Sequence, residues 1–168
     1  MPFRLRLHGV RRRLFKNTQR GVFILDYLSH SVAETEALGR RLAAVLPPGA
    51  VVACRGGLGV GKTAFTRGLA QGLGYEGRVT SPTFAIVNEY RGGRIPLFHF
   101  DIYRLNGPED LWDIGFEDYL EQDGGVCVIE WSERAEEVMP EDAVRVSIAC
   151  HPEEEGWRMI TIEGVPPL

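Results

Sequence analysis

An eight-residue run in the first half of the chain constrains the fold more than any other feature of its 168 residues. Residues 56–63 read Gly-Gly-Leu-Gly-Val-Gly-Lys-Thr and satisfy the pattern Gly-x-x-x-x-Gly-Lys-[Ser/Thr] in full. Glycines at these positions let backbone N–H groups turn inward around phosphate oxygens, while the lysine reaches the outer phosphates and the hydroxyl suits Mg²⁺. The pattern therefore predicts a phosphate-binding loop between a buried strand and a helix.

The sequence on both sides of the loop supplies that strand and that helix. Residues 50–54 form an apolar stretch typical of a buried parallel strand. Residues 62–73 place Phe65 and Leu69 on one helix face, and Gly74 ends the helix. The positive N-terminal end of this helix is expected to point at the bound anion, as the loop requires.

The rest of the chain alternates short apolar runs with amphipathic ones, an order that favours a three-layer α/β domain of the P-loop NTPase class. Further strands are expected at residues 22–28, 84–90, 95–100, 126–129, 144–149 and 158–162. Further helices are expected after the capping box of Ser31 and Glu34 and at residues 108–122, the latter kinked near Gly115. The central sheet should be mixed and mainly parallel, with an antiparallel edge from the last two strands.

Two carboxylates follow predicted buried strands and are candidates for metal binding and catalysis. Glu130 ends the apolar run 126–129, and Asp101 ends a less uniform one. We therefore favour Glu130 as the acid that joins Thr63 at a Mg²⁺ ion. Asp101 is expected to contact the metal through water or to orient the attacking water, with a turn-capping role as the alternative. Together with Lys62, the two acids are the predicted catalytic groups.

The positions of the lysines limit which nucleotide the loop is expected to bind. The chain has only two, Lys16 and Lys62, and neither belongs to the Asn-Lys-x-Asp element expected of a guanine-specific GTPase. ATP is therefore the predicted nucleotide.

Charge divides the chain into two parts. Residues 1–21 carry seven basic residues and no acidic one, whereas the remainder carries 12 basic and 23 acidic residues, a net charge of −11. We expect residues 1–21 to be a disordered basic extension and residues 22–168 to form one P-loop ATPase domain. A transit peptide, a nucleic-acid-binding arm and an upstream start codon that lengthens the reading frame are other interpretations of the extension. No apolar run approaches the roughly 20 residues of a membrane span, and three cysteines in apolar stretches indicate buried, reduced thiols in a cytoplasmic protein.

Five further segments accompany the phosphate loop. They are Arg67-Gly68-Leu69, Thr80-Ser81-Pro82-Thr83-Phe84, Asn88-Glu89-Tyr90, His99-Phe100-Asp101-Ile102-Tyr103-Arg104-Leu105 and Ile129-Glu130-Trp131. In this order the segments resemble the bacterial TsaE (YjeE) family, over roughly residues 28–161. That family is the ATPase component of the machinery that makes N6-threonylcarbamoyladenosine in tRNA. The resemblance implies an ATPase that turns over slowly and drives the cycle of a partner.

The resemblance also implies which residues hold the phosphates and the metal. The residues expected to contact the nucleotide at the loop are Gly57, Leu58, Gly59, Val60, Gly61, Lys62, Thr63 and Ala64. Thr63 and Glu130 are the implied Mg²⁺ ligands, and Asp101, expected from its position to reach the metal through water, is the third candidate.

Residues outside the loop complete the implied nucleotide site. Thr83 belongs to a switch segment in which its hydroxyl senses the γ-phosphate, and Trp131 lies at the nucleotide. Val32 and Thr35 begin a helix that approaches the adenine. Arg134 is expected to reach the base or a phosphate, with a surface salt bridge as the alternative.

Two positions depart from the resembled family. The family commonly has an acidic residue in place of Gly57 and a proline in place of Ser132. Gly57 removes a carboxylate near the phosphates and adds freedom to the loop, so nucleotide affinity or turnover is expected to differ from that of relatives.

The implied partner is a heterodimer of two related proteins with a sugar-kinase-like fold, one of which transfers the threonylcarbamoyl group. Contact with tRNA would then be indirect, through that complex. Two other functions stay open at this point: a stand-alone phosphotransferase that acts on a small molecule, and an RNA-binding module led by the basic extension.

Overall fold

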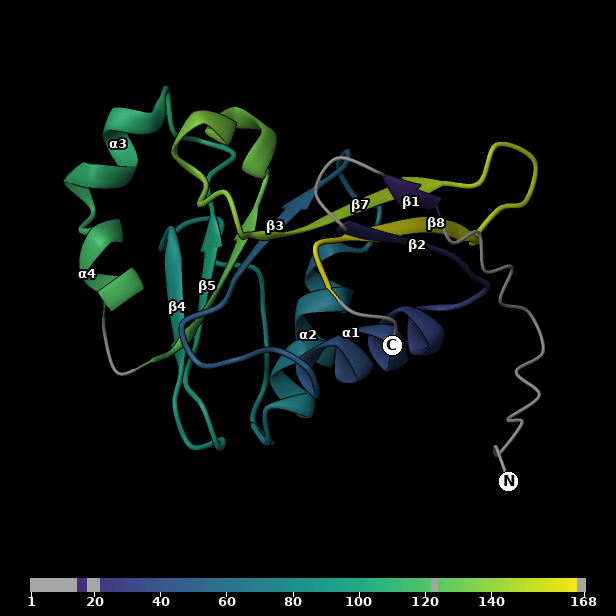
Figure 1. Cartoon of the computed structure of the whole chain (residues 1–168), viewed down its shortest axis with the longest axis horizontal. Helices are drawn as coiled ribbons and strands as arrows, with labels where there is room; N and C mark the ends of the chain where they lie inside the picture. Colours follow the sequence, from purple (N-terminus) through teal and green to yellow (C-terminus); the bar gives the residue numbers. More distant parts are fainter. Residues whose placement is uncertain (1–14, 18–21, 122–123, 166–168) are drawn as a thin grey trace.

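The structure, a computed structural model, describes residues 15–17, 22–121 and 124–165 (Figure 1). The prediction of a disordered extension at residues 1–21 therefore falls almost entirely outside the described residues; within it, only residues 15–17 are described, as a short strand. No helix in the described ranges is both long enough and apolar enough to cross a membrane.

Strands and helices occur in the predicted order. The strands are β1 (Phe15–Asn17), β2 (Val22–Ser29), β3 (Val51–Arg55), β4 (Val87–Tyr90), β5 (Leu97–Asp101), β6 (Val126–Glu130), β7 (Val144–Cys150) and β8 (Arg158–Glu163). The α-helices are α1 (Val32–Ala43), α2 (Lys62–Gly72), α3 (Pro108–Asp113) and α4 (Phe116–Glu121). Two 3-10 helices, η1 (Ser132–Arg134) and η2 (Glu136–Val138), follow β6.

All described strands form one mixed sheet in the order β1-β2-β8-β7-β3-β6-β5-β4. The central strands β7, β3, β6 and β5 are parallel, and the pairings on both flanks are antiparallel. This arrangement confirms the predicted parallel centre with an antiparallel edge. The antiparallel pair β7 and β8 is as predicted, but β2 and β1 lie beyond it at the margin of the sheet.

The sheet has helices on both faces, which makes three layers (Figure 1). Helices α1 and α2 cover one face, and α3, α4 and the two 3-10 helices cover the other face of the parallel strands. Gly39 of α1 and Gly68 of α2 allow the two helices to touch, because a Cβ atom on either would collide with the backbone of the other helix. This close packing fixes the axis of α2, whose first turn carries the phosphate-loop lysine.

Three local predictions were wrong. Residues 108–122 do not form one kinked helix but two short ones, because Gly115 adopts φ +77 and ends the helical path. The strand predicted from Phe84 begins only at Val87, since a turn closed by hydrogen bonds to the carbonyl of Pro82 occupies the preceding residues. Cys54 and Cys127 are buried free thiols as predicted, but Cys150 is exposed.

Candidate functional site

The predicted phosphate loop lies between β3 and α2, at the carboxyl end of the parallel strands. Gly56, Gly59 and Gly61 have φ values of 141°, 72° and 113°, which residues with a side chain rarely adopt. A Cβ atom on Gly56 would also collide with the carbonyl oxygen of Ile148 on β7. Glycine is therefore required at this position both by the backbone conformation and by the close approach of a neighbouring strand.

The backbone amides of the loop suit an anion. Within the described part of the chain, the amides of residues 57–61 donate to no protein acceptor, whereas the amide of Gly56 lies 3.4 Å from the carboxylate of Glu133. Thr63 and Ala64 follow in the first turn of α2, where the helix dipole is positive. The side chain of Leu58 is 89% exposed, so we expect its backbone rather than its side chain to contact a nucleotide.

Lys62 lies at the mouth of this loop and is almost fully buried. Its ammonium donates to the carbonyls of Gly56 and Gly57 at 2.6 and 2.7 Å. The same nitrogen lies 3.7 Å from the centre of the Trp131 ring, a cation–π contact. Burial lowers the pKa of Lys62, and the nearby carboxylates, Glu130 first among them, oppose that shift.

Trp131 reaches the lysine through an unusual backbone conformation. It directly follows β6 and has φ +66, a left-handed geometry rare for a bulky residue. Its ring also packs against the ring of Tyr103, with centroids 4.7 Å apart. Trp131 thus contacts the loop lysine, and its contact with a nucleotide stays a prediction.

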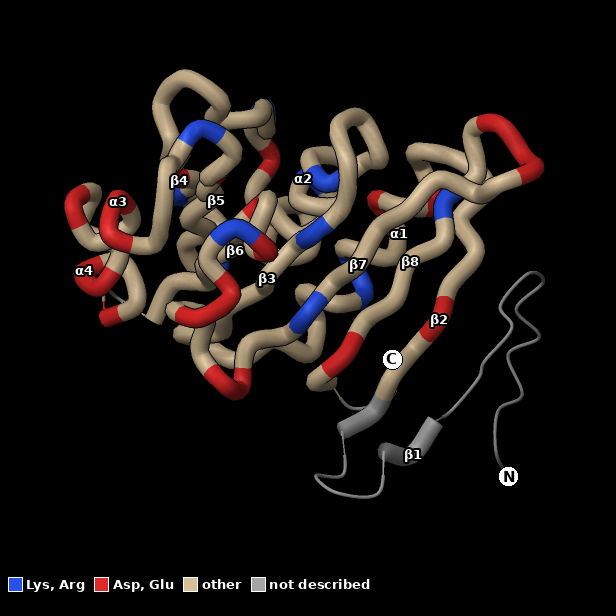
Figure 2. The backbone as a smooth tube through the Cα atoms, turned by 90° about the horizontal axis from the view of Figure 1, so that it is seen from above, with Lys and Arg blue, Asp and Glu red and all other residues tan. Residues whose placement is uncertain are grey.

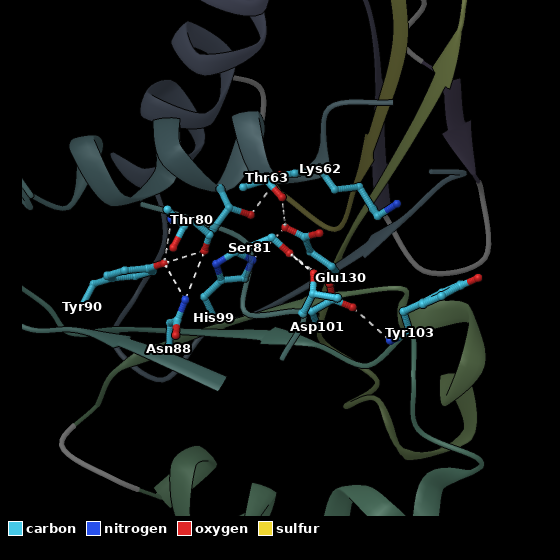
Figure 3. A network of polar contacts seen from close by, with 12 residues as sticks. Lys62, Thr63, Thr80, Ser81, Asn88, Tyr90, His99, Asp101, Tyr103 and Glu130 are labelled. Carbon is cyan, nitrogen blue, oxygen red and sulfur yellow. Dashed lines mark hydrogen bonds and ion pairs between the residues drawn. The ribbon is translucent and has the colours of Figure 1, made fainter. Parts of the chain in front are cut away.

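Glu130 connects the loop with the end of the sheet (Figure 3). The hydroxyl of Thr63 donates to Glu130 Oε1 at 2.9 Å, and His99 Nε2 lies 2.7 Å from the same oxygen. Since a carboxylate only accepts, Nε2 carries the proton, and the buried Nδ1 of His99 has no partner in the described structure. A hydroxyl and a carboxylate beside a phosphate loop are the oxygen ligands that Mg²⁺ prefers.

The described residues contain no cluster of three or more His, Cys, Asp or Glu side chains that could hold a metal ion. A Mg²⁺ site with only one or two protein carboxylates fits this pattern, because the ion usually keeps several waters and binds substrate phosphates. Thr63 and Glu130 therefore fit the ion that the sequence predicts.

Asp101 stands beside Glu130, since the two residues are register partners on β5 and β6. Its Oδ2 accepts hydrogen bonds from the hydroxyls of Ser81 and Thr83 at 3.1 and 3.2 Å (Figure 3). Its Oδ1 accepts from the amide of Tyr103 at 3.0 Å. Asp101 thus caps the turn after β5, the alternative role considered for it, and also holds the predicted switch segment.

The start of α1 lies against the phosphate loop. Thr35 is buried and shares a 2.8 Å hydrogen bond with Ser29, and its methyl group faces Gly61. Val32, at the first position of the helix, is 63% exposed. Half of the predicted capping box is present: the hydroxyl of Ser31 accepts a hydrogen bond from the amide of Glu34, but the Glu34 carboxylate accepts from the amide of His30 rather than from that of Ser31. The structure thus brings Thr35 to the loop and leaves Val32 open to solvent.

Arg134 lies at the edge of this constellation. It donates to the carbonyl of Leu105 at 2.9 Å, and its guanidinium carbon lies 5.8 Å from the centre of the Tyr103 ring. Among the described residues it makes no salt bridge. Its link to the loop is indirect, through Tyr103 and Trp131.

Sequence reasoning assigned no role to His99 or to Tyr103. The spacing of His99 could have placed it at the site, because it lies two residues from Asp101 on a strand and both side chains therefore share one face. No comparable signal existed for Tyr103, because its contact depends on the left-handed backbone at Trp131.

Comparison with known proteins finds relatives of this chain in sequence and in structure. The family model described as "Threonylcarbamoyl adenosine biosynthesis protein TsaE" matches residues 29–159. The chain is 40% identical to the tRNA threonylcarbamoyladenosine biosynthesis protein TsaE of Bacillus subtilis over 132 residues, covering 79% of this chain and 80% of that protein. It is 43% identical to the Treponema pallidum protein of the same name over 121 residues, covering 72% and 88%. The crystal structure of Bacillus subtilis YdiB superimposes with a TM-score of 0.69 at 34% identity, covering 86% of this chain and 88% of that one.

Proposed function

The chain belongs to the TsaE family, and from that premise we propose that it is a P-loop ATPase acting in the biosynthesis of threonylcarbamoyladenosine in tRNA. One observation carries the ATPase part of the proposal. Thr63 and Glu130 share a hydrogen bond beside a loop that has glycines in left-handed conformations and whose amides at residues 57–61 donate to no acceptor in the described structure. A phosphate cradle and a set of oxygen ligands for a metal therefore lie side by side.

Catalysis in this proposal is mainly electrostatic. The loop amides and the ammonium of Lys62 bind the outer phosphates of ATP and neutralise the charge that builds up as the γ-phosphoryl group leaves. Thr63 and Glu130, with Asp101 next to them, would hold Mg²⁺, and the ion when bound would supply further charge neutralisation. Asp101, held in place by Ser81 and Thr83, orients the attacking water.

Distribution of charge supports a protein partner and only indirect contact with tRNA. Figure 2 shows Asp and Glu residues gathered on α3 and α4, which would repel a nucleic-acid backbone. A heterodimer of sugar-kinase-like-fold proteins is the proposed partner. Apart from residues 15–17, the basic extension that could contact RNA lies outside the described residues.

Reconstitution tests the proposal. The purified chain, the two partner proteins, tRNA and ATP-Mg²⁺ are expected to yield modified adenosine, measured by mass spectrometry of digested tRNA. Lys62→Ala should reduce both ATP turnover and modification to background, whereas Arg145→Ala, a charge removal from an exposed ion pair with Glu136, should leave both unchanged. Wild-type levels of both activities in Lys62→Ala would contradict the proposal.

One observation favours a second candidate, the stand-alone phosphotransferase. A polar pocket lined by Arg67 and Arg78 opens beside Thr63, where an acceptor molecule could meet the γ-phosphate. Transfer of label from [γ-³²P]ATP to an added metabolite without partner proteins would support this candidate. Release of all the label as inorganic phosphate would exclude it for the metabolites tested.

A further inference from the structure

The pocket beside Thr63 has a volume of about 410 Å³. One wall is a single face of α2, formed by Thr63, Arg67 and Gln71, which are four residues apart and therefore lie one above the other. The other wall is the segment 77–81. The volume falls in the range of small-molecule sites.

Charge in this pocket is opposite to that of the molecule as a whole. Two arginines line it and no carboxylate does, although the chain carries 23 Asp and Glu residues against 19 Lys and Arg. Arg67 is held by Glu36 of α1 at 2.6 Å, so its own charge is largely compensated. Arg78 is exposed, and no ion pair joins it to a carboxylate within the described ranges. Arg78 is therefore the uncompensated positive charge of the pocket.

The wall that carries Arg78 is anchored by the two residues that directly follow this arginine. Val79 is buried in the core beside α2. The hydroxyl of Tyr90 donates to the carbonyl of Thr80 at 2.9 Å and lies 3.3 Å from its amide, and Asn88 donates to the same carbonyl at 3.2 Å (Figure 3). The pocket wall is thus part of the folded structure rather than a free loop, and it presents Arg78 from a fixed backbone.

The pocket is continuous with the proposed catalytic site. Thr63 lines the pocket and bonds Glu130, and Ser81 lines it and bonds Asp101. Hydrolysis of ATP forms a bond between a water oxygen and the γ-phosphorus, breaks the bond to the β-phosphate oxygen, and yields ADP, hydrogen phosphate and a proton. If ATP binds at the phosphate loop as proposed, the phosphate product would be released beside Thr63, where the pocket begins.

We propose that this pocket binds a phosphate oxyanion, and that its ligand is the inorganic phosphate released from ATP, held by Arg78 and Arg67 after cleavage. Only the identification of the ligand as the product of ATP cleavage rests on the proposed ATPase function. The inference that the pocket binds phosphate does not. Guanidinium groups bind phosphate through charge-assisted, often bidentate hydrogen bonds, which makes Arg78 the main contributor.

Equilibrium dialysis of [³²P]phosphate against the full chain saturated with ADP-Mg²⁺ tests the binding site, because ADP occupies the phosphate loop. Arg78→Ala is expected to weaken phosphate binding about tenfold, Arg78→Lys to weaken it less, and the matched charge removal Arg145→Ala to leave it unchanged. Equal affinity in wild type and Arg78→Ala would overturn the proposal. Because this measurement needs no turnover, it stands even if the chain fails to hydrolyse ATP.

Two further measurements identify the source. Inorganic phosphate should inhibit steady-state ATP turnover of the wild type, and Arg78→Ala should shift that inhibition to about tenfold higher phosphate. Glycerol 3-phosphate, a phosphate monoester, should compete no better than inorganic phosphate. Tighter binding of the monoester, or phosphate inhibition that is unaltered in Arg78→Ala, would contradict a product site.

Discussion

The phosphate loop and the segment 81–86 face each other across the end of the sheet, but they are held by different means. The loop takes its shape from glycines in left-handed conformations and from the backbone of β7, which passes too close to Gly56 for any side chain. The facing segment has no glycine, contains Ile86 at φ +67, and is tied to Asp101 by two hydroxyl groups. The loop is thus fixed by its glycine conformations and a neighbouring strand. The segment is held by its own turn at Pro82, by the bond from the Asp101 amide to the Ile86 carbonyl, and by two hydroxyl contacts with the Asp101 carboxylate.

Glu130 and Asp101 also differ in how firmly their hydrogen-bond partners are held. Glu130 bonds Thr63 of the loop and His99 of the buried strand, so it is held from both sides. Asp101 bonds hydroxyls that belong to an exposed segment. We therefore expect a ligand at the site to displace the partners of Asp101 more readily than those of Glu130. On this expectation we call residues 81–86 the movable half of the site and the phosphate loop the fixed half.

Gly56→Ala should have the largest effect, because it distorts the phosphate loop, which is the fixed half of the site. The added methyl group meets the carbonyl of Ile148 and forces alanine into φ +141, so we expect the free energy of unfolding to fall by about 3 kcal/mol and nucleotide binding to be lost. Urea denaturation and a nucleotide-binding titration measure the two effects.

Gly57→Ala is the matched control for this change. Its Cβ would make only an ordinary 3.8 Å contact with Val60, and its φ is not in the left-handed region. The free energy of unfolding should stay within about 0.5 kcal/mol of wild type. Equal destabilisation by both substitutions would mean that the close approach to β7 does not determine the shape of the loop.

Glu130→Gln should have the next largest effect. The substitution keeps the volume but removes the charge that faces Thr63 and His99, so we expect ATP turnover to fall roughly 100-fold and the Mg²⁺ concentration for half-maximal activity to rise. Glu133→Gln, a neutralisation of an exposed carboxylate beside the same loop, should change turnover by less than about threefold. A similar loss in both variants would indicate a general effect of charge rather than a specific ligand.

The fixed half could be predicted from the sequence for a physical reason. A glycine-rich phosphate loop encodes its conformation locally, so the pattern at residues 56–63 was enough to place the strand, the loop and helix α2. The acid at the end of β6 was also predictable, because a buried apolar strand that ends in a carboxylate implies a use for that charge. Whether these groups act on ATP remains a prediction.

The movable half was not predictable in the same way. The strand expected from Phe84 begins at Val87, because Pro82 closes a turn whose hydrogen bonds compete with the sheet. The left-handed backbone at Ile86 and Trp131 depends on tertiary contacts, and β-branched and aromatic residues give no local signal for it. The helix break at Gly115 was visible as a kink, but a single glycine does not tell a kink from an end.

Thr83→Val tests the contact that holds the movable half. Valine keeps the shape and removes the hydroxyl that donates to Asp101, so ATP turnover should fall a few-fold while the free energy of unfolding falls by about 1 kcal/mol or less. Thr83→Ser, which retains the hydroxyl, should restore most of the turnover. Loss of turnover in the serine variant as well would show that the methyl group, not the bond to Asp101, is what the segment needs.

The smallest effect on stability should come from replacing two exposed side chains, Leu58 on the phosphate loop and Phe84 on the segment 81–86. Leu58 is 89% exposed on the loop. Phe84 is 88% exposed on the segment, where its ring makes a surface cation–π contact with Arg104 at 4.6 Å. Leu58→Ala and Phe84→Ala should each change the free energy of unfolding by no more than about 0.5 kcal/mol, as surface substitutions do. If Phe84→Ala alone lowered it by more than 1 kcal/mol, the ring would have to be packed in solution. The segment would then be as firmly held as the loop, and the difference between the two halves would lie only in their sequences.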